Sequence, residues 1–265
     1  MFDAMINKRI KTEGLSFVLA MSDIEKLNHY AVSGEFDVIK ISYALYPQVS
    51  ENYQILNSGS ALGHANGPLL VSKAKIYPDE VEDLHIAIPG LNTTANLLLS
   101  IAYPNVKKKT EYLFSDIEEV VLSGEADAGL LIHENRFTYN ARGLKKILDL
   151  GTWWEEKTEM PIPLGGIMIR RSLPQTLKDT VNHVLHNSIS YAMEHPKVAM
   201  DFICEHAQSM DDDVIQKHID LYVNDYSLDL GEKGRKAIEK LFERVTKTNK
   251  MKELTQPIFA NKSDN

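Results

Sequence analysis

Two stretches of the chain repeat the same order of polar and apolar positions. The phrase Ser-Asp-Ile-Glu stands at residues 22–25 and again at 115–118, and this pattern is typical of a helix N-terminus. Each predicted helix ends at a Ser-Gly-Glu phrase, and each is followed by an apolar strand, expected at residues 37–42 and 128–132. Two similar units so far apart in the chain predict two α/β lobes built alike.

The other apolar segments continue this alternation of strands and helices. Phe2, Met5, Ile6 and Ile10 recur at helical spacing, so the chain begins inside a helix. From Leu173 onward, apolar stripes of helical period predict helices that wrap the first lobe. Further strands are expected at residues 15–19, 69–72, 85–88 and 163–170, and a further helix at 94–103.

These elements predict an α/β fold whose two lobes face each other across a cleft. The first lobe is expected to comprise residues 1–76 and 160–265, and the second lobe residues 77–159. Ligands of open α/β sheets bind beyond the carboxyl ends of the strands. The residues to examine are therefore those that follow the two repeated strands.

Composition narrows the range of partners. The net charge is −8, so the chain lacks the basic surface that nucleic acids or anionic membranes require. The single cysteine, Cys204, excludes an internal disulfide and a thiolate metal cage. No apolar run is long enough to span a bilayer, and the N-terminus lacks the pattern of a signal peptide. We therefore expect a cytoplasmic protein that acts on a small molecule.

His133 is the first candidate for chemistry, because it ends an apolar strand and begins a polar group. An imidazole near its ordinary pKa suits proton abstraction at neutral pH. The alternative is a structural histidine that caps the strand. Glu134 and Arg136 are candidates to orient the ring, or else form a surface pair.

A second set of candidates forms an anion site. Thr93 and Thr94 stand where a strand and a glycine turn lead into a helix, whose free amide groups attract an anion; an ordinary N-cap is the alternative. Lys40 and Ser42, at the end of the matching strand, offer a cation and a hydroxyl, although Lys40 could equally be a solvated edge charge.

We expect neither a metal nor a cofactor. His183 and His186 are three residues apart on a predicted helix, but no third ligand stands nearby in the sequence, so a solvated helix face is the better interpretation. No phosphate-binding loop, dinucleotide-binding fingerprint or serine nucleophile elbow is present.

Four phrases together resemble a known enzyme family. They are residues 59–68 (GSALGHANGP), 89–95 (PGLNTTA), 131–139 (LIHENRFTY) and 150–156 (LGTWWEE). In this order, and over nearly the whole chain, they are similar to the 1,4-dihydroxy-6-naphthoate synthases of the futalosine route to menaquinone. The segment around His133 distinguishes this family from general solute receptors.

The resemblance implies a fold, a reaction and a set of site residues. The implied fold is that of type II periplasmic binding proteins, with two strands that cross between the lobes. The implied reaction is a metal-independent carbon–carbon lyase reaction that converts cyclic dehypoxanthinylfutalosine to 1,4-dihydroxy-6-naphthoate. By resemblance, His133 is the proton acceptor, Lys40, Ile41, Ser42, Thr93 and Thr94 bind the carboxylated substrate, and Ser60 and Asn66 are supporting candidates.

One departure and two alternatives complete the interpretation. Members of the family begin with a strand and a Pro-, Cys-, Asn- and Asp-containing loop before the first helix, whereas this sequence starts at the helix. We therefore expect that the recorded start lies downstream of the true one, or that the first lobe lacks a strand. The alternatives are a solute-binding protein for a small carboxylate and chorismate dehydratase, a sister enzyme with the same fold.

Overall fold

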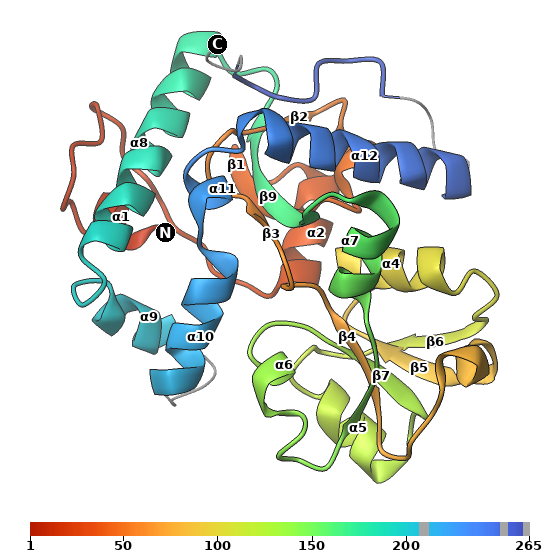
Figure 1. Ribbon diagram of the computed structural model, residues 1–265. Coiled ribbons are helices and arrows are strands. Elements are labelled where there is room, and N and C mark those ends of the chain that lie inside the picture. The colour runs from red at the N-terminus through yellow and green to blue at the C-terminus, as the bar shows by residue number, and fades with distance from the viewer. Residues whose placement is uncertain (207–211, 250–253, 262–265) are drawn as a thin grey trace.

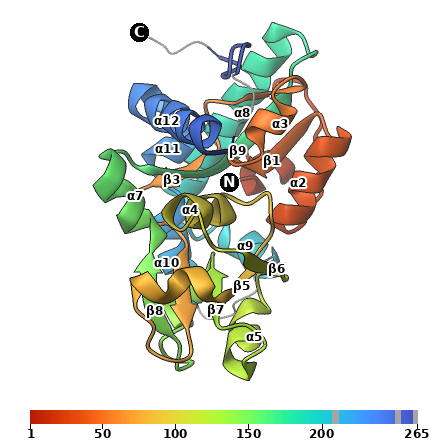
Figure 2. The same ribbon diagram turned by 90° about the vertical axis from the view of Figure 1, so that its right-hand side faces the viewer.

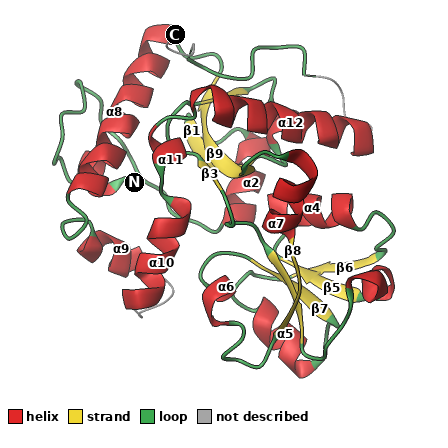
Figure 3. Ribbon diagram, in the orientation of Figure 1, coloured by secondary structure: helices red, strands yellow, loops and turns green. Residues whose placement is uncertain are grey.

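The computed structural model describes residues 1–206, 212–249 and 254–261, and it contains two α/β lobes (Figure 1). Each lobe has its own β-sheet with helices packed around it, as the secondary-structure colouring of Figure 3 shows. The predicted α/β class and two-lobed arrangement are confirmed. Within the described residues, no helix is both long and apolar enough to span a membrane.

The sheet of the first lobe is built around one long strand, β9 (Ile162–Arg170). Three strands pair with β9, all antiparallel: β1 (Val38–Ser42), β2 (Tyr53–Ile55) and β3 (Ala61–Gly63). The expected return of the chain at residues 163–170 is therefore the centre of this sheet. The helices of this lobe are α1 (Asp3–Ile6), α2 (Ile24–Ser33), α3 (Tyr46–Val49), α8 (Gln175–Glu194), α9 (Met200–His206), α10 (Asp212–Tyr222), α11 (Asp225–Leu228) and α12 (Gly231–Asn249).

The sheet of the second lobe has five strands in the order β6-β5-β7-β4-β8. β5 is parallel to β6 and to β7, whereas β4 is antiparallel to both of its neighbours. Its strands are β4 (Leu69–Ser72), β5 (His85–Ile88), β6 (Lys108–Glu111), β7 (Ala128–Leu131) and β8 (Lys145–Asp149). Its helices are the 3₁₀ helix η1 (Pro78–Asp83), α4 (Thr94–Ala102), α5 (Ile117–Ser123), α6 (Asn135–Thr138) and α7 (Leu150–Thr158).

The chain passes between the lobes twice, and the two passages touch. It leaves the first lobe after β3 and returns through α7 into β9. A Cβ atom on Gly67 would lie only 2.3 Å from the Cα of Gly151, so both passages need glycine. Because β4 pairs with β7 and β8, it belongs to the second lobe, and the lobe boundary expected at residue 76 is placed too late.

A continuous core joins the lobes. Its main cluster includes Tyr43 from the first lobe, Ile88 and Leu98 from the second, and Trp154 from the passage between them. In Figure 2, α4 lies between the two sheets, which places its N-terminus at the junction. The relative positions of the lobes therefore depend on shared apolar packing as well as on the chain connections.

The two repeated units are present, with one difference between them. α2 leads into β1 through Gly34 at φ 70°, and α5 leads into β7 through Gly124 at φ 83°, so both helices end in the left-handed cap predicted for glycine. The side chain of Asp23 accepts the N–H of Lys26 and caps α2. Asp116, at the start of α5, makes no such bond.

The strand expected at residues 15–19 is wrong. These residues alternate between half-buried and exposed positions, with Leu15 and Phe17 packed against the first lobe and Val18 96% exposed. Among the described residues no strand lies beside them to complete a hydrogen-bonded ladder, so an alternating pattern alone does not make a strand.

Candidate active site

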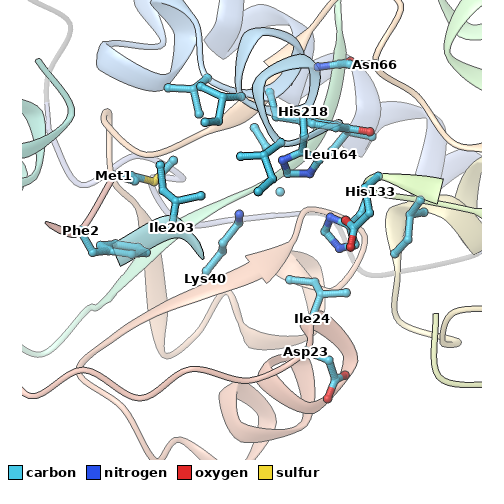
Figure 4. A pocket seen from close by; sticks show the side chains of 18 of the residues that line it. Met1, Phe2, Asp23, Ile24, Lys40, Asn66, His133, Leu164, Ile203 and His218 are labelled. Atoms are coloured by element: carbon cyan, nitrogen blue, oxygen red, sulfur yellow. The ribbon is translucent and has the colours of Figure 1, made fainter. Parts of the chain in front are cut away.

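A cavity of about 920 Å³ lies between the lobes. The ends of β1 and β7, the N-termini of α2 and α4, and the helices α9 and α10 contribute to its lining. Figure 4 shows the side chains of Lys40, His133 and His218 converging on one part of it. The predicted site residues that line the cavity are Lys40, Ser42, Asn66, Thr93, Thr94, His133 and Glu134.

His133 occupies a strained backbone position at the cavity wall. It lies between β7 and α6 with φ 55°, a left-handed conformation that is uncommon for residues other than glycine. Its ring contacts Phe114 edge to face at a centroid distance of 5.0 Å. Such strain is maintained only where the surroundings determine it, which is frequent at functional sites.

The electrostatic surroundings of His133 favour a neutral ring. Burial, and after it the neighbouring His218 and Lys40, together lower its pKa to about 3. The assumption of an ordinary pKa, made from sequence, therefore does not hold for the unliganded cavity. At neutral pH the imidazole is unprotonated and has a free lone pair to accept a proton.

His218 was not among the residues singled out from the sequence. It lies on α10, and its ring centroid is 5.8 Å from that of His133. Its Nε2 atom is buried and finds no hydrogen-bond partner within the part of the chain that the structure describes. No sequence signal identifies it, because it stands alone on an amphipathic helix far along the chain from His133.

Lys40 supplies a positive charge to the cavity. Burial alone lowers the pKa of its ammonium group, and no carboxylate among the described residues offsets this effect. Ser42, two residues later on β1, is held by Asn28, whose Oδ1 accepts the Ser42 N–H at 3.0 Å and whose Nδ2 donates to Ser42 Oγ at 3.3 Å. The first-lobe wall therefore offers an unpaired cation beside a fixed hydroxyl.

The two threonines are already engaged within the protein. Thr93 is the N-cap of α4 and accepts the N–H of Asn96 at 3.2 Å. Thr94 Oγ1 donates to the carbonyl of Leu164 at 2.6 Å and accepts the N–H of Ala44 at 3.3 Å. Thr93 is therefore the N-cap given above as the alternative, and Thr94 ties the second lobe to the first. The anion site at these two residues stays a prediction.

Asn66 presents an unsatisfied amide to the cavity. Its side chain is fully buried, and within residues 1–206, 212–249 and 254–261 neither Oδ1 nor Nδ2 has a hydrogen-bond partner. Buried amides in proteins are normally paired. A ligand with both a donor and an acceptor would satisfy this one.

Three predicted site residues lie outside the cavity lining: Ile41, Ser60 and Arg136, of which Arg136 is described below. Ile41 points into the core, because side chains alternate along β1 and its neighbours Lys40 and Ser42 face the cavity. Ser60 is buried against the hydroxyl of Tyr43 at 2.6 Å. Direct contact of these two side chains with a ligand in the cavity is therefore not expected.

Arg136 holds the junction between the lobes. Its guanidinium donates to the carbonyl of Gly67 at 2.9 Å and pairs with Asp149 at 3.2 Å. Asp149 in turn caps α7. Among the described residues, the hydrogen bonds of Arg136 go to Gly67 and Asp149, and no hydrogen bond joins Glu134 to the ring of His133. Which of the two orients the ring stays a prediction.

One trio of side chains has the spacing of a metal site. Ligand atoms of His133, Glu134 and His218 all lie within 4.8 Å of one another. The ammonium group of Lys40 is also close enough to lower the pKa of both imidazoles, and this positive charge opposes the binding of a metal cation. The other histidine pair is different: His183 is exposed and its Nε2 contacts Asn187 at 2.9 Å.

Solved structures show how widespread the fold is. An X-ray structure of a protein from Archaeoglobus fulgidus matches 94% of this chain and 92% of its own with a TM-score of 0.89 and 35% identity. A ligand-binding component of an ABC-type import system from Staphylococcus aureus matches 89% of this chain and 81% of its own, with a TM-score of 0.65 at 14% identity. The second match shows that the fold is shared with periplasmic binding proteins, as predicted.

Sequence comparisons identify the family. The family model described as menaquinone biosynthesis matches residues 1–247. The 1,4-dihydroxy-6-naphthoate synthase of Thermus thermophilus is 39% identical over 97% of this chain and 93% of its own length. The synthase of Streptomyces coelicolor is 37% identical over 92% of this chain and 87% of its own. The chain therefore belongs to the menaquinone-biosynthesis family that includes the 1,4-dihydroxy-6-naphthoate synthases.

Proposed function

We propose that this enzyme is a carbon–carbon lyase that converts cyclic dehypoxanthinylfutalosine to 1,4-dihydroxy-6-naphthoate, with His133 as the general base. The observation that carries the proposal is the convergence on one cavity of the neutral imidazole of His133 and the ammonium group of Lys40, which has no carboxylate partner in the described parts of the chain. Family membership supports the reaction, and the cavity supports the assignment of residues.

The cation selects and orients the substrate. A buried ammonium group without a carboxylate partner favours a ligand that brings its own negative charge. The carboxylate of the substrate would fill this role beside Ser42, and the unsatisfied amide of Asn66 would hydrogen-bond a second polar group of the same molecule. The partner we propose is therefore a small carboxylated molecule.

Substrate binding also adjusts the base. Lys40 lowers the pKa of His133 in the unliganded cavity. A bound carboxylate neutralises part of this positive field, and the pKa of the imidazole then rises toward the value at which a general base is most effective. The base is thus strengthened only when the anionic substrate is in place.

The test is direct product formation. The purified chain is incubated anaerobically with cyclic dehypoxanthinylfutalosine, and 1,4-dihydroxy-6-naphthoate is measured by chromatography and mass spectrometry, with substrate binding followed by calorimetry. We expect equal turnover by the wild type and by His183→Gln, which changes an exposed histidine on α8, and a kcat lower by about 10³-fold for His133→Gln.

Two other outcomes identify the alternatives. Tight binding of the substrate by folded wild-type protein without product would indicate a solute-binding protein for small carboxylates. Formation of an enolpyruvyl benzoate from chorismate, with no activity on the futalosine-derived substrate, would indicate the sister dehydratase. The cytoplasmic location expected from the sequence is part of the proposal. Cell fractionation of the organism that makes the protein tests it.

A further inference from the structure

The cavity contains a second imidazole, that of His218, to which the proposed reaction assigns no role. The Nε2 atom of His218 is buried and has no hydrogen-bond partner among the described residues, and His218 lines the same cavity as His133. A buried polar atom without a partner is rare in folded proteins, because its desolvation is not compensated. A ligand atom in the cavity would complete it.

The two imidazoles belong to opposite walls. His133 follows β7 of the second lobe, whereas His218 lies on α10, which packs against β3 of the first lobe. The ring centroids are 5.8 Å apart, and the labelled side chains in Figure 4 point into the same space. A substrate between the lobes would therefore meet one imidazole on each side.

The groups that surround His218 keep its ring neutral. Lys40 approaches from β1, His133 and Glu134 from the turn after β7, and Tyr222 from the next turn of α10 at a ring distance of 4.6 Å. Burial, and then Lys40, lower its pKa to about 4. A neutral imidazole has one N–H donor and remains a good hydrogen-bond donor without carrying charge.

We propose that His218 is a second catalytic residue, whose Nε2–H donates a hydrogen bond to the substrate oxygen that becomes negatively charged as the carbon–carbon bond breaks. The inference rests on the proposed lyase function. In this proposal His218 on α10 stabilises the negative charge on the substrate oxygen, and His133 after β7 transfers the proton.

The step balances without an external reagent. A substrate hydroxyl gives its proton to His133, and the electron pair of that O–H bond forms the new C=O bond of the departing fragment. The electron pair of the broken carbon–carbon bond moves to the carbonyl oxygen of the remaining bicycle as an enolate. That oxygen, held by His218, then takes the proton from His133, so no proton or electron is gained or lost.

Three variants separate the roles. His218→Leu removes the donor, whereas His218→Gln keeps an amide N–H in its place. The control is His183→Gln, which changes an exposed histidine on α8. Loss of one donor to a developing oxyanion lowers kcat by about 10²- to 10³-fold. We expect this loss in His218→Leu with the substrate Kd within threefold, and recovery of at least tenfold in kcat in His218→Gln.

Steady-state kinetics and calorimetry also decide what would overturn the inference. A kcat of His218→Leu within twofold of wild type, or an effect confined to KM, would show that His218 only shapes the cavity. Loss of wild-type activity on treatment with EDTA, restored by Zn²⁺, would overturn the inference, because the trio of His133, Glu134 and His218 would then be the candidate metal site. Absence of turnover in the wild type would refute the proposed function itself, and is thereby distinguished from failure of His218 alone.

Discussion

The two helix–glycine–strand units place different chemistry at the same local position. In the first, α2, Gly34 and β1 deliver Lys40 and Ser42 to the cavity; in the second, α5, Gly124 and β7 deliver His133. Side chains at the end of β1 follow ordinary alternation, whereas His133 is directed by a left-handed backbone. Similar local sequence thus places the proposed binding groups on one wall of the cavity and the proposed catalytic group on the other.

The largest expected effect comes from removing the second unit's imidazole. His133→Gln should lower kcat by about 10³-fold, since a positioned general base contributes about 10²- to 10⁴-fold. Binding by calorimetry should stay within threefold, because the proposed anion site is on the opposite wall. Equal loss of binding and turnover would show that His133 is a binding residue like its counterpart in the first unit.

Removing the cation of the first unit should act mainly on binding. Lys40→Met should weaken substrate binding by about 10- to 100-fold, the typical effect of losing a charge-assisted contact. A fall in kcat with unchanged Kd would instead place Lys40 in the chemical step. Calorimetry and steady-state kinetics on the same preparation distinguish these results.

The same substitution predicts a pH-dependent gain in stability. Burial holds the pKa of Lys40 below its ordinary value, so the unfolded chain binds more protons than the folded chain between the lowered pKa and about 10.5. The free energy of unfolding of the wild type should therefore rise with pH through that window. At neutral pH Lys40→Met should be more stable than the wild type, and this difference should become smaller as the pH rises. Thermal unfolding of both proteins from pH 7 to 10 measures the difference; a constant difference would contradict it.

The two cap glycines should respond alike. Both have positive φ, and a Cβ atom at either would meet nothing within 4 Å, so the cost is conformational and not steric. Gly34→Ala and Gly124→Ala should each destabilise the protein by about 1 kcal/mol, measured by urea unfolding. A difference between them of more than about 1 kcal/mol would mean that the lobes respond differently to the same local strain.

The smallest effect concerns the helix starts. Asp23 caps α2 through the N–H of Lys26, and Asp116 makes no such bond at α5. Asp23→Ala should cost about 1 kcal/mol and Asp116→Ala a few tenths. Equal losses in urea unfolding would show that both aspartates act through the helix dipole rather than through a capping bond.

Sequence patterns predicted those elements correctly whose limits are set by neighbouring residues in the chain. The ends of α2 and α5, the strand at residues 85–88 and the start of α4 follow from caps, glycines and apolar runs. The pattern failed at residues 15–19, because a strand also needs a neighbour, which sequence alternation does not supply. The assignment of β4 to the wrong lobe has the same cause: pairing partners are chosen at long range.

The amino-acid sequence alone determined the α/β class, the repeated units, the family resemblance and His133 with its polar neighbours, because these depend on short-range periodicity and contiguous motifs. The tertiary structure decided which of the candidates meet. It excluded Ile41, Ser60 and Arg136 from the cavity, and it added His218. It also depressed the pKa values of Lys40 and His133, since burial and charge proximity arise only when segments distant in the chain pack together.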